Sequence, residues 1–239
     1  MIENKYNVGT LDLKPSVKLL LLHPTSPDDG REGPFPSEPQ GYLLPTTSVD
    51  EIYCLGAPRT IPDADACRRA TPFVVEKSRW AEAQAYDAVV VNCMLDPGVH
   101  EAKRAVDIPV VGLREATRAI ASLVGENPAH IFPAGLSPLA LADDEERTVL
   151  ELLAKGRWQT SVRGADVLIP NCAYLGGLAQ RLQDELGVPV LANRHIGLRC
   201  GELLATFRLL RARAWVDATR PSRMRRLLLR VGSRIKRML

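Results

Sequence analysis

The chain has 239 residues, of which 46% are hydrophobic and 25% charged, so it holds enough apolar material for one large core or two smaller ones. No apolar run approaches the roughly 20 residues of a membrane-spanning helix, and the first 15 residues contain no apolar signal-peptide core, which predicts a cytoplasmic protein. The five cysteines are odd in number and lack C-x-x-C spacing, which argues against a disulfide framework and a zinc site.

The first predicted elements are two strands separated by a long loop. Residues 17–22 (VKLLLL) form a continuous apolar run, typical of a strand covered on both faces, and the motif HPTS follows at residues 23–26. A polar loop at the end of such a strand is where open α/β sheets bind ligands. Residues 24–45 contain six prolines and three glycines, so we expect a lid or a disordered loop there. Residues 49–55 suit a second strand, and residues 72–84 suit a helix that begins at a proline.

One layout then occurs twice, at residues 86–124 and 165–204. In each copy a short apolar run ends in Asn-Cys, a helix-like segment follows, and a second apolar run opens with proline. Cys93 precedes Pro109 by sixteen residues, and Cys172 precedes Pro189 by seventeen. This repetition predicts a duplicated lobe with the cysteines at equivalent strand ends.

Strands and helices alternate over the whole length, which predicts an α/β fold with parallel sheets covered on both faces. We expect lobe one to span residues 1–114, with 205–219 returning to it, and lobe two to span 115–204. Residues 220–239 form a separate basic segment whose apolar residues lie on one helical stripe.

A cysteine between a parallel strand and a helix lies near free backbone amides and the positive end of the helix dipole, which favour the thiolate. If the two lobes face each other, Cys93 and Cys172 approach one substrate from opposite sides. One thiolate would then remove a proton from a stereogenic carbon while the opposite thiol delivers one to the other face. The alternative is that Cys93 and Cys172 are small buried apolar residues and that the repeat is purely structural. We interpret the other three cysteines, Cys54, Cys67 and Cys200, as structural.

Residues 87–116 (DAVVVNCMLDPGVHEAKRAVDIPVVGLREA) and 164–192 (GADVLIPNCAYLGGLAQRLQDELGVPVLA) resemble the aspartate/glutamate/hydantoin racemase superfamily, and within it the hydantoin racemase branch. The HPTS motif stands where family members have a motif similar to NPNTS. The resemblance implies two similar flavodoxin-like lobes with the active site between them. It also implies no cofactor, neither pyridoxal phosphate nor metal, and a pair of acid/base cysteines, which fall on Cys93 and Cys172.

By position, the resemblance also implies a set of substrate-binding residues around the two cysteines. Met94, Ala173 and Tyr174 stand directly after them and include bulkier residues than the small or hydroxyl ones common in the family. Glu115 and His195 follow the closing strands of their lobes and are candidates for orienting a thiol, against the alternatives of a solvated glutamate and a packed histidine. The implied substrate-binding residues are Thr25, Ser26, Asn92, Asn171, Met94, Ala173 and Tyr174.

The leading functional hypothesis is a cofactor-independent isomerase, a racemase or epimerase of a small amino acid or hydantoin-type substrate. The alternatives are an isomerase or decarboxylase of the same fold that uses one cysteine, and a non-catalytic binding or scaffold protein.

Residues 206–239 hold eleven Arg or Lys and a single acidic residue. This basic tail is predicted to contact the protein's own body, another subunit of a homo-oligomer, or an anionic membrane surface. The absence of aromatic residues after Trp215 argues against nucleic acid.

Overall fold

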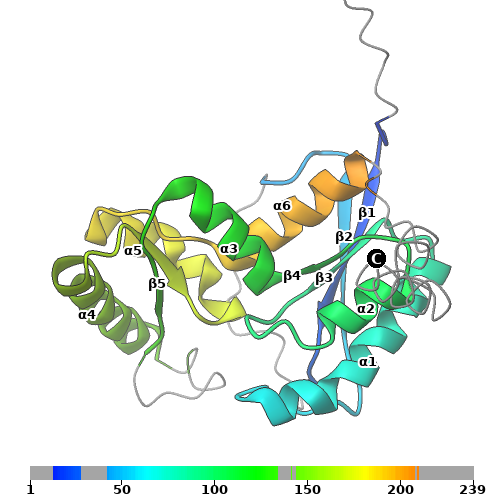
Figure 1. Ribbon diagram of the computed structural model, residues 1–239, viewed down its shortest axis with the longest axis horizontal. Coiled ribbons are helices and arrows are strands. Elements are labelled where there is room, and N and C mark those ends of the chain that lie inside the picture. Colours follow the sequence, from blue (N-terminus) through cyan, green and yellow to red (C-terminus); the bar gives the residue numbers. More distant parts are fainter. Residues whose placement is uncertain (1–12, 28–41, 134–140, 142–143, 208, 210–239) are drawn as a thin grey trace, which may run out of the picture.

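The computed structural model describes residues 13–27, 42–133, 141, 144–207 and 209, and shows an α/β protein (Figure 1). The predicted α/β class with parallel sheets is confirmed, because every strand pair in the described residues is parallel. The four-stranded sheet has the order β2-β1-β3-β4, and a second sheet pairs β5 with β6. In chain order the elements are β1 (Val17–His23), β2 (Thr47–Tyr53), α1 (Ala64–Ala83), β3 (Ala88–Val91), α2 (Val99–Ala105), β4 (Val110–Gly112), α3 (Leu113–Val124), β5 (Pro128–Ile131), α4 (Glu145–Arg163), β6 (Val167–Pro170), the 3-10 helix η1 (Ala173–Leu178), α5 (Ala179–Leu186) and α6 (Asn193–Thr206).

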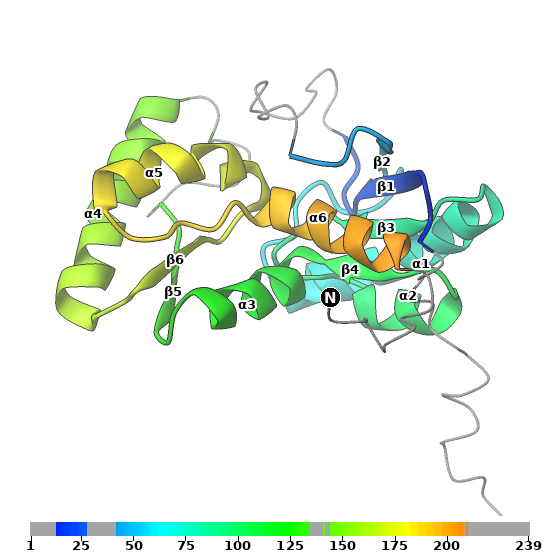
Figure 2. The same ribbon diagram turned by 90° about the horizontal axis from the view of Figure 1, so that it is seen from above.

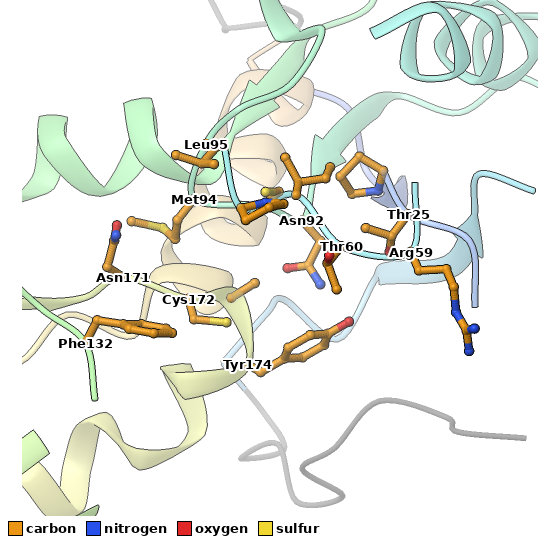
Figure 3. Close-up of a pocket in the computed structure, with 15 residues that line it drawn as sticks. Thr25, Arg59, Thr60, Asn92, Met94, Leu95, Phe132, Asn171, Cys172 and Tyr174 are labelled. Atoms are coloured by element: carbon orange, nitrogen blue, oxygen red, sulfur yellow. The ribbon is translucent and has the colours of Figure 1, made fainter. Parts of the chain in front are cut away.

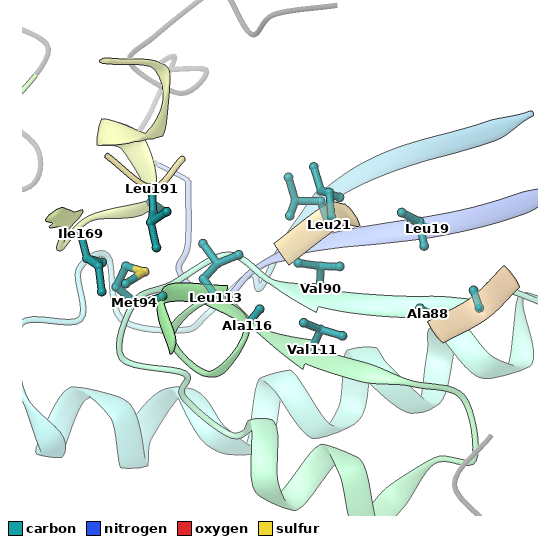
Figure 4. Packing of buried hydrophobic residues seen from close by; sticks show 14 of the residues in the cluster. Leu19, Leu21, Ala88, Val90, Met94, Val111, Leu113, Ala116, Ile169 and Leu191 are labelled. Carbon is teal, nitrogen blue, oxygen red and sulfur yellow. The ribbon is translucent and has the colours of Figure 1, made fainter. Parts of the chain in front are cut away.

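Strand β1 lies in the middle of the larger sheet and is buried on both faces, as its continuous apolar run predicts. Leu19 and Leu21 pack in a cluster with residues of β3, α3 and α6, part of which is drawn in Figure 4. Leu20 and Leu22 pack on the opposite face against α1 and α2. Full burial of one leucine side chain stabilises a fold by about 1.5–3 kcal/mol, so this strand is a principal source of the lobe's stability.

Helix α1 begins at Ala64 and not at Pro72, where the sequence predicted its start. The Asp63 side chain accepts a hydrogen bond from the backbone N–H of Ala66 at 2.9 Å, which satisfies a free donor at the first turn. Pro72 lies inside the helix. Residues on both sides of this proline are buried, Ala70 before it and Val74 after it, and Val74 packs in the core cluster beneath the helix. This burial outweighs the unfavourable helix propensity of proline.

The duplication predicted from the sequence is visible in the backbone hydrogen bonds. In the first copy the N–H of Val89 donates to the carbonyl of Pro109, and in the second the N–H of Leu168 donates to that of Pro189, both at 2.9 Å. The second apolar run of that copy, residues 188–191, was expected to form a strand but makes only one bridge, between Leu168 and Val190. The second copy is therefore a shorter version of the first.

Helices α3 and α6 pack against each other between the two sheets (Figure 2). Residues 115–204 were expected to form lobe two, yet α6 also packs on β1, β3 and β4 of the larger sheet. The segment 205–219 lies almost entirely outside the described residues, as do the basic segment 220–239 and most of the proline-rich loop. Of the helices the structure describes, none combines the length and apolarity needed to cross a membrane.

Candidate active site

A pocket of about 510 Å³ opens at the carboxyl ends of the strands of both sheets. This is the edge at which parallel α/β sheets bind ligands. Its walls come from the loops after β1, β3, β5 and β6 and from the segment before α1 (Figure 3). The lining residues are Pro24, Thr25, Arg59, Thr60, Ile61, Pro62, Asn92, Cys93, Met94, Leu95, Phe132, Asn171, Cys172, Ala173 and Tyr174.

Most of the residues implied by the family resemblance line this one pocket. Both cysteines do so, together with Thr25, Asn92, Asn171, Met94, Ala173 and Tyr174. Ser26 does not: its hydroxyl donates to the carbonyl of Cys54 at 3.2 Å and accepts from the N–H of Gly56 at 2.9 Å, so it holds a turn beside the pocket.

Cys93 follows β3 in a tight turn, in which the N–H of Asp96 donates to its carbonyl at 3.1 Å. The backbone N–H of Leu95 donates to its thiol. The pKa of Cys93 is raised to about 12, mainly by burial; the Leu95 hydrogen bond opposes this rise, and the neighbouring Cys172 adds to it.

Cys172 repeats this arrangement after β6. The N–H of Leu175 donates to its carbonyl at 3.1 Å, and the N–H of Tyr174 donates to its thiol. Burial raises the pKa of Cys172 to about 11. The sequence predicted that amides and helix dipoles would favour the thiolate at both positions; that prediction was wrong, because desolvation outweighs the single amide at each sulfur. Both groups are thiols at neutral pH in the ligand-free protein.

In each copy one polar side chain joins the cysteine loop to a helix behind it. Asp96 accepts hydrogen bonds from the N–H groups of Arg114 and Glu115 at 3.0 and 2.9 Å, which ties the Cys93 loop to the first turn of α3. In the other half, the amide of Asn193 on α6 donates to the carbonyls of Pro170 and Cys172 at 2.7 and 2.9 Å. Different residues therefore perform the same task in the two copies.

The two candidates for orienting a thiol lie outside the pocket lining. The carboxylate of Glu115 accepts from the N–H of Gly112 at 3.1 Å and pairs with Lys103. His195 is buried on α6, with its ring edge-on to Tyr42 at 4.5 Å between centroids.

A polar chain adjoining the pocket was not predicted from the sequence. The buried imidazole of His23 contacts Glu51 through Nε2 at 2.9 Å and Asn92 through Nδ1 at 3.3 Å, and it stacks on the ring of Tyr53 at 4.2 Å. Arg194 pairs with Glu51 from α6. The alternation of residues along β2, which puts Glu51 two positions before Tyr53, was the only signal that could have pointed to this cluster.

The described residues of the pocket lining are mainly apolar, and no carboxylate is among them. Arg59 is the one charged side chain among them, and it is exposed. Burial raises the pKa of Tyr174, so its hydroxyl is protonated at neutral pH. Among the residues that the structure describes, no group of three or more His, Cys, Asp or Glu is arranged to hold a metal ion. The chemically reactive groups of this pocket are its two thiols.

The sequence is similar to racemases of known families. The Asp/Glu/Hydantoin racemase family profile matches residues 43–132. The chain is 26% identical over 215 residues to the hydantoin racemase of Paenarthrobacter aurescens, which covers 79% of this chain and 91% of that protein. It is 25% identical over 159 residues to the hydantoin racemase of Pseudomonas sp. (strain NS671), covering 56% of this chain and 64% of that relative, just under two thirds of its length.

The fold is that of a solved racemase. The allantoin racemase from Klebsiella pneumoniae superposes with a TM-score of 0.72 at 19% sequence identity, over 82% of this chain and 91% of that one. The family profile, the curated relatives and the fold agree with the resemblance carried by the two cysteine segments. The chain is therefore similar to proteins of the Asp/Glu/hydantoin racemase superfamily, hydantoin racemases among them.

Proposed function

We propose that this protein is a cofactor-independent racemase that inverts a stereogenic carbon by proton transfer between Cys93 and Cys172. The observation that carries the proposal is that both thiols line one pocket, each at the end of a strand in one copy of the repeat. Their turns are built alike, with an N–H two residues on donating to each sulfur. Two equivalent acid/base groups are what inversion in both directions requires.

In the proposed reaction, one cysteine acts as a thiolate and removes the proton bonded to the stereogenic carbon. The opposite cysteine, as a thiol, then donates its proton to the other face of the resulting carbanion. The carbanion is stabilised as an enolate by an adjacent carbonyl, whose oxygen would be bound by backbone amides of the two cysteine loops. At the end the two cysteines have exchanged protonation states, and the reverse reaction starts from the other one.

The lining of the pocket favours a neutral ring over a free amino acid. A zwitterion needs a carboxylate to pair with its ammonium group, and none is among the lining residues that the structure describes. Apolar side chains such as Met94 and Phe132 instead suit an uncharged hydantoin with an apolar substituent at its stereogenic carbon, C5. The hydantoin racemases among the relatives support the same substrate class.

The test is proton exchange in heavy water, followed by NMR and optical rotation, with both enantiomers of 5-benzylhydantoin and of amino acids. We expect loss of rotation with exchange of the C5 proton, and loss of racemisation in both directions in Cys93→Ser and in Cys172→Ser. Cys200→Ser is the matched control, because Cys200 lies on α6 outside the pocket lining and should be dispensable. Full racemisation by either active-site variant would contradict the two-base mechanism. If the protein exchanges none of the substrates, a decarboxylase or a non-catalytic binding role gains support.

A further inference from the structure

Three polar side chains from three segments form a chain that ends beside Cys93. Glu51 lies on β2, His23 ends β1, and Asn92 follows β3 immediately before the cysteine. The Nε2 atom of His23 is 2.9 Å from Oε2 of Glu51, and its Nδ1 atom is 3.3 Å from Nδ2 of Asn92. The imidazole is almost wholly buried, and its stacking on Tyr53 fixes the plane of the ring.

The direction of each hydrogen bond in this chain follows from Glu51 and Asn92. The hydrogen bond from His23, with the nearby charge of Arg194, holds the pKa of Glu51 below its ordinary value, so its carboxylate is ionised and only accepts. Nε2 of His23 must then carry a proton, and Nδ1 accepts because it faces the Nδ2 donor of Asn92. The oxygen of Asn92 therefore points away from the histidine.

The oxygen of Asn92 lacks a hydrogen-bond partner in the described part of the chain, although it is buried. Asn92 itself is 6% exposed and lines the pocket. Figure 3 places its carboxamide among the lining side chains, with the oxygen turned to the side of Cys172. Buried acceptors are nearly always paired in folded proteins, and one left open in the wall of a pocket indicates a group that a ligand completes.

We propose that Glu51 and His23 are positioning residues that fix the Asn92 carboxamide, and that its oxygen accepts a hydrogen bond from an N–H of the substrate beside Cys93. The inference rests on the proposed function and makes it more specific: the preferred substrate carries an N–H near its stereogenic carbon, as a ring ureide does. A site that hydrogen-bonds a substrate N–H discriminates strongly against analogues without that N–H. An apolar site discriminates only weakly between ligands of similar shape.

The kinetic test compares 5-benzylhydantoin with its N1-methyl and N3-methyl analogues in the wild type and in variants. We expect one N-methyl analogue to lose about tenfold or more in kcat/KM with the wild type, the equivalent of about 1.4 kcal/mol. Asn92→Ala should raise KM for the unmethylated substrate and abolish the discrimination. Glu51→Gln should reduce the discrimination in the wild-type background, and adding it to Asn92→Ala should cause no further change, because the contact is already lost.

Asp50→Asn is the matched control for Glu51→Gln. Asp50 is the neighbouring acid on β2, and its carboxylate accepts from the hydroxyl of Tyr86 at 2.7 Å and pairs with Lys18, away from His23. Asp50→Asn converts a carboxylate to an amide on the same strand, as Glu51→Gln does. We expect it to leave the preference for the unmethylated hydantoin at the wild-type value. Unchanged discrimination in Asn92→Ala, or an equal loss in Asp50→Asn, would overturn the inference.

Two measurements without turnover separate this inference from the proposed function. ¹⁵N NMR of the imidazole should show His23 protonated on Nε2 and not on Nδ1; the opposite tautomer would overturn the positioning role. Calorimetry with 5,5-dimethylhydantoin, which has no C5 proton and cannot racemise, should show tighter binding than one of its N-methyl derivatives. If the protein shows this binding preference but no exchange activity, the racemase proposal is refuted and the Asn92 contact is retained. If 5,5-dimethylhydantoin and its N1-methyl and N3-methyl derivatives bind equally, the contact is refuted.

Discussion

The side-chain amide of Asn193 donates a hydrogen bond of 2.9 Å to the backbone carbonyl of Cys172. Asn193 is the first residue of α6 and is completely buried. Its oxygen accepts from the N–H of Arg194 at 2.7 Å, so both ends of the amide are engaged. Because α6 also packs on the larger sheet, this asparagine connects the cysteine loop of one copy to the core of the other.

Replacing Asn193 by alanine should loosen the Cys172 loop. We expect the free energy of unfolding to fall by about 1–3 kcal/mol, because buried carbonyls lose their donor. We also expect faster alkylation of Cys172 by iodoacetamide, since a less buried thiol has a lower pKa, and an unchanged rate at Cys93. Mass spectrometry of the labelled peptides measures both rates in one experiment.

Asn127→Ala is a suitable comparison for that variant. The amide of Asn127 also donates to two carbonyls, those of Arg163 and Gly164 at 3.1 and 2.9 Å, but it is exposed. Water can replace its hydrogen bonds, so the stability should change less and neither thiol should respond. Equal acceleration of labelling at Cys93 and Cys172 in Asn193→Ala would indicate general loosening of the fold and contradict a local role.

Asp96 should make the protein less stable as the pH rises from about 4 to 6. Burial raises its pKa from 3.8 to about 6, despite the two amides that lower it. The folded state therefore holds this proton more tightly than the unfolded state, and the resulting stabilisation is complete below pH 4 and lost as the pH rises through 6. The two pKa values limit the effect to about 3 kcal/mol. Urea unfolding of the wild type and of Asp96→Asn at several pH values measures it, because the variant should lack this slope.

Asp166 should have the opposite effect on the pH dependence of stability, because its pKa is lowered. It too accepts from two backbone N–H groups, those of Glu126 and Asn127 at 2.7 and 2.9 Å, but those amides lower the pKa of a carboxylate that water reaches freely. Its contribution to stability is present above the ordinary pKa of an aspartate and is lost as the pH falls through its lowered value. Asp166→Asn should therefore weaken the protein at neutral pH and leave the slope between pH 4 and 6 intact. The same slope change in both variants would contradict the assignment to Asp96.

The sequence was sufficient to locate the two cysteines because the features that position them are local. Each follows an apolar run of strand length, and parallel strands bring their carboxyl ends to one edge of a sheet. The repeated Asn-Cys spacing then predicted equivalence. The backbone N–H groups of Asn92 and Asn171 agree with it, because they donate to carbonyls of the neighbouring strands, those of Leu22 and Ile131, both at 2.8 Å. A single sequence carries this kind of information well.

The state of the thiols and the polar chain around His23 could not be predicted in the same way. The pKa of each cysteine depends on how completely other segments exclude water from it, and no local pattern gives that exclusion. Glu51 and Arg194 are 143 positions apart, and only the packing of α6 on the larger sheet brings them together. The prediction of a helix that starts at Pro72 began α1 eight residues too late, because the packed helix tolerates this proline in its interior.

Racemisation should accelerate as the pH rises through the neutral and alkaline range. The pKa values of about 12 for Cys93 and about 11 for Cys172 leave only a small thiolate fraction at pH 7 in the free protein. Since kcat/KM reports the ionisation of free enzyme, its logarithm should increase with pH between about 7 and 10. Thiolate absorbance, followed over the same range in Cys93→Ser and Cys172→Ser, assigns each ionisation. A plateau that begins near pH 7 would show that the thiols ionise far more easily than their burial implies.

Gly201→Ala should displace α6 and lower both stability and activity. A Cβ atom at Gly201 would lie 2.9 Å from the side chain of Val90 on β3, so helix and sheet must separate. Overpacking of this kind costs about 1–3 kcal/mol, against a gain of roughly 1 kcal/mol in helix propensity. Since Asn193 lies on the displaced helix, kcat should fall as well. Gly177→Ala is the control, because a Cβ there meets no atom within 4 Å, and its unfolding midpoint should not decrease. If Gly201→Ala lowers the unfolding midpoint and leaves kcat unchanged, then displacement of α6 does not disturb the Cys172 loop.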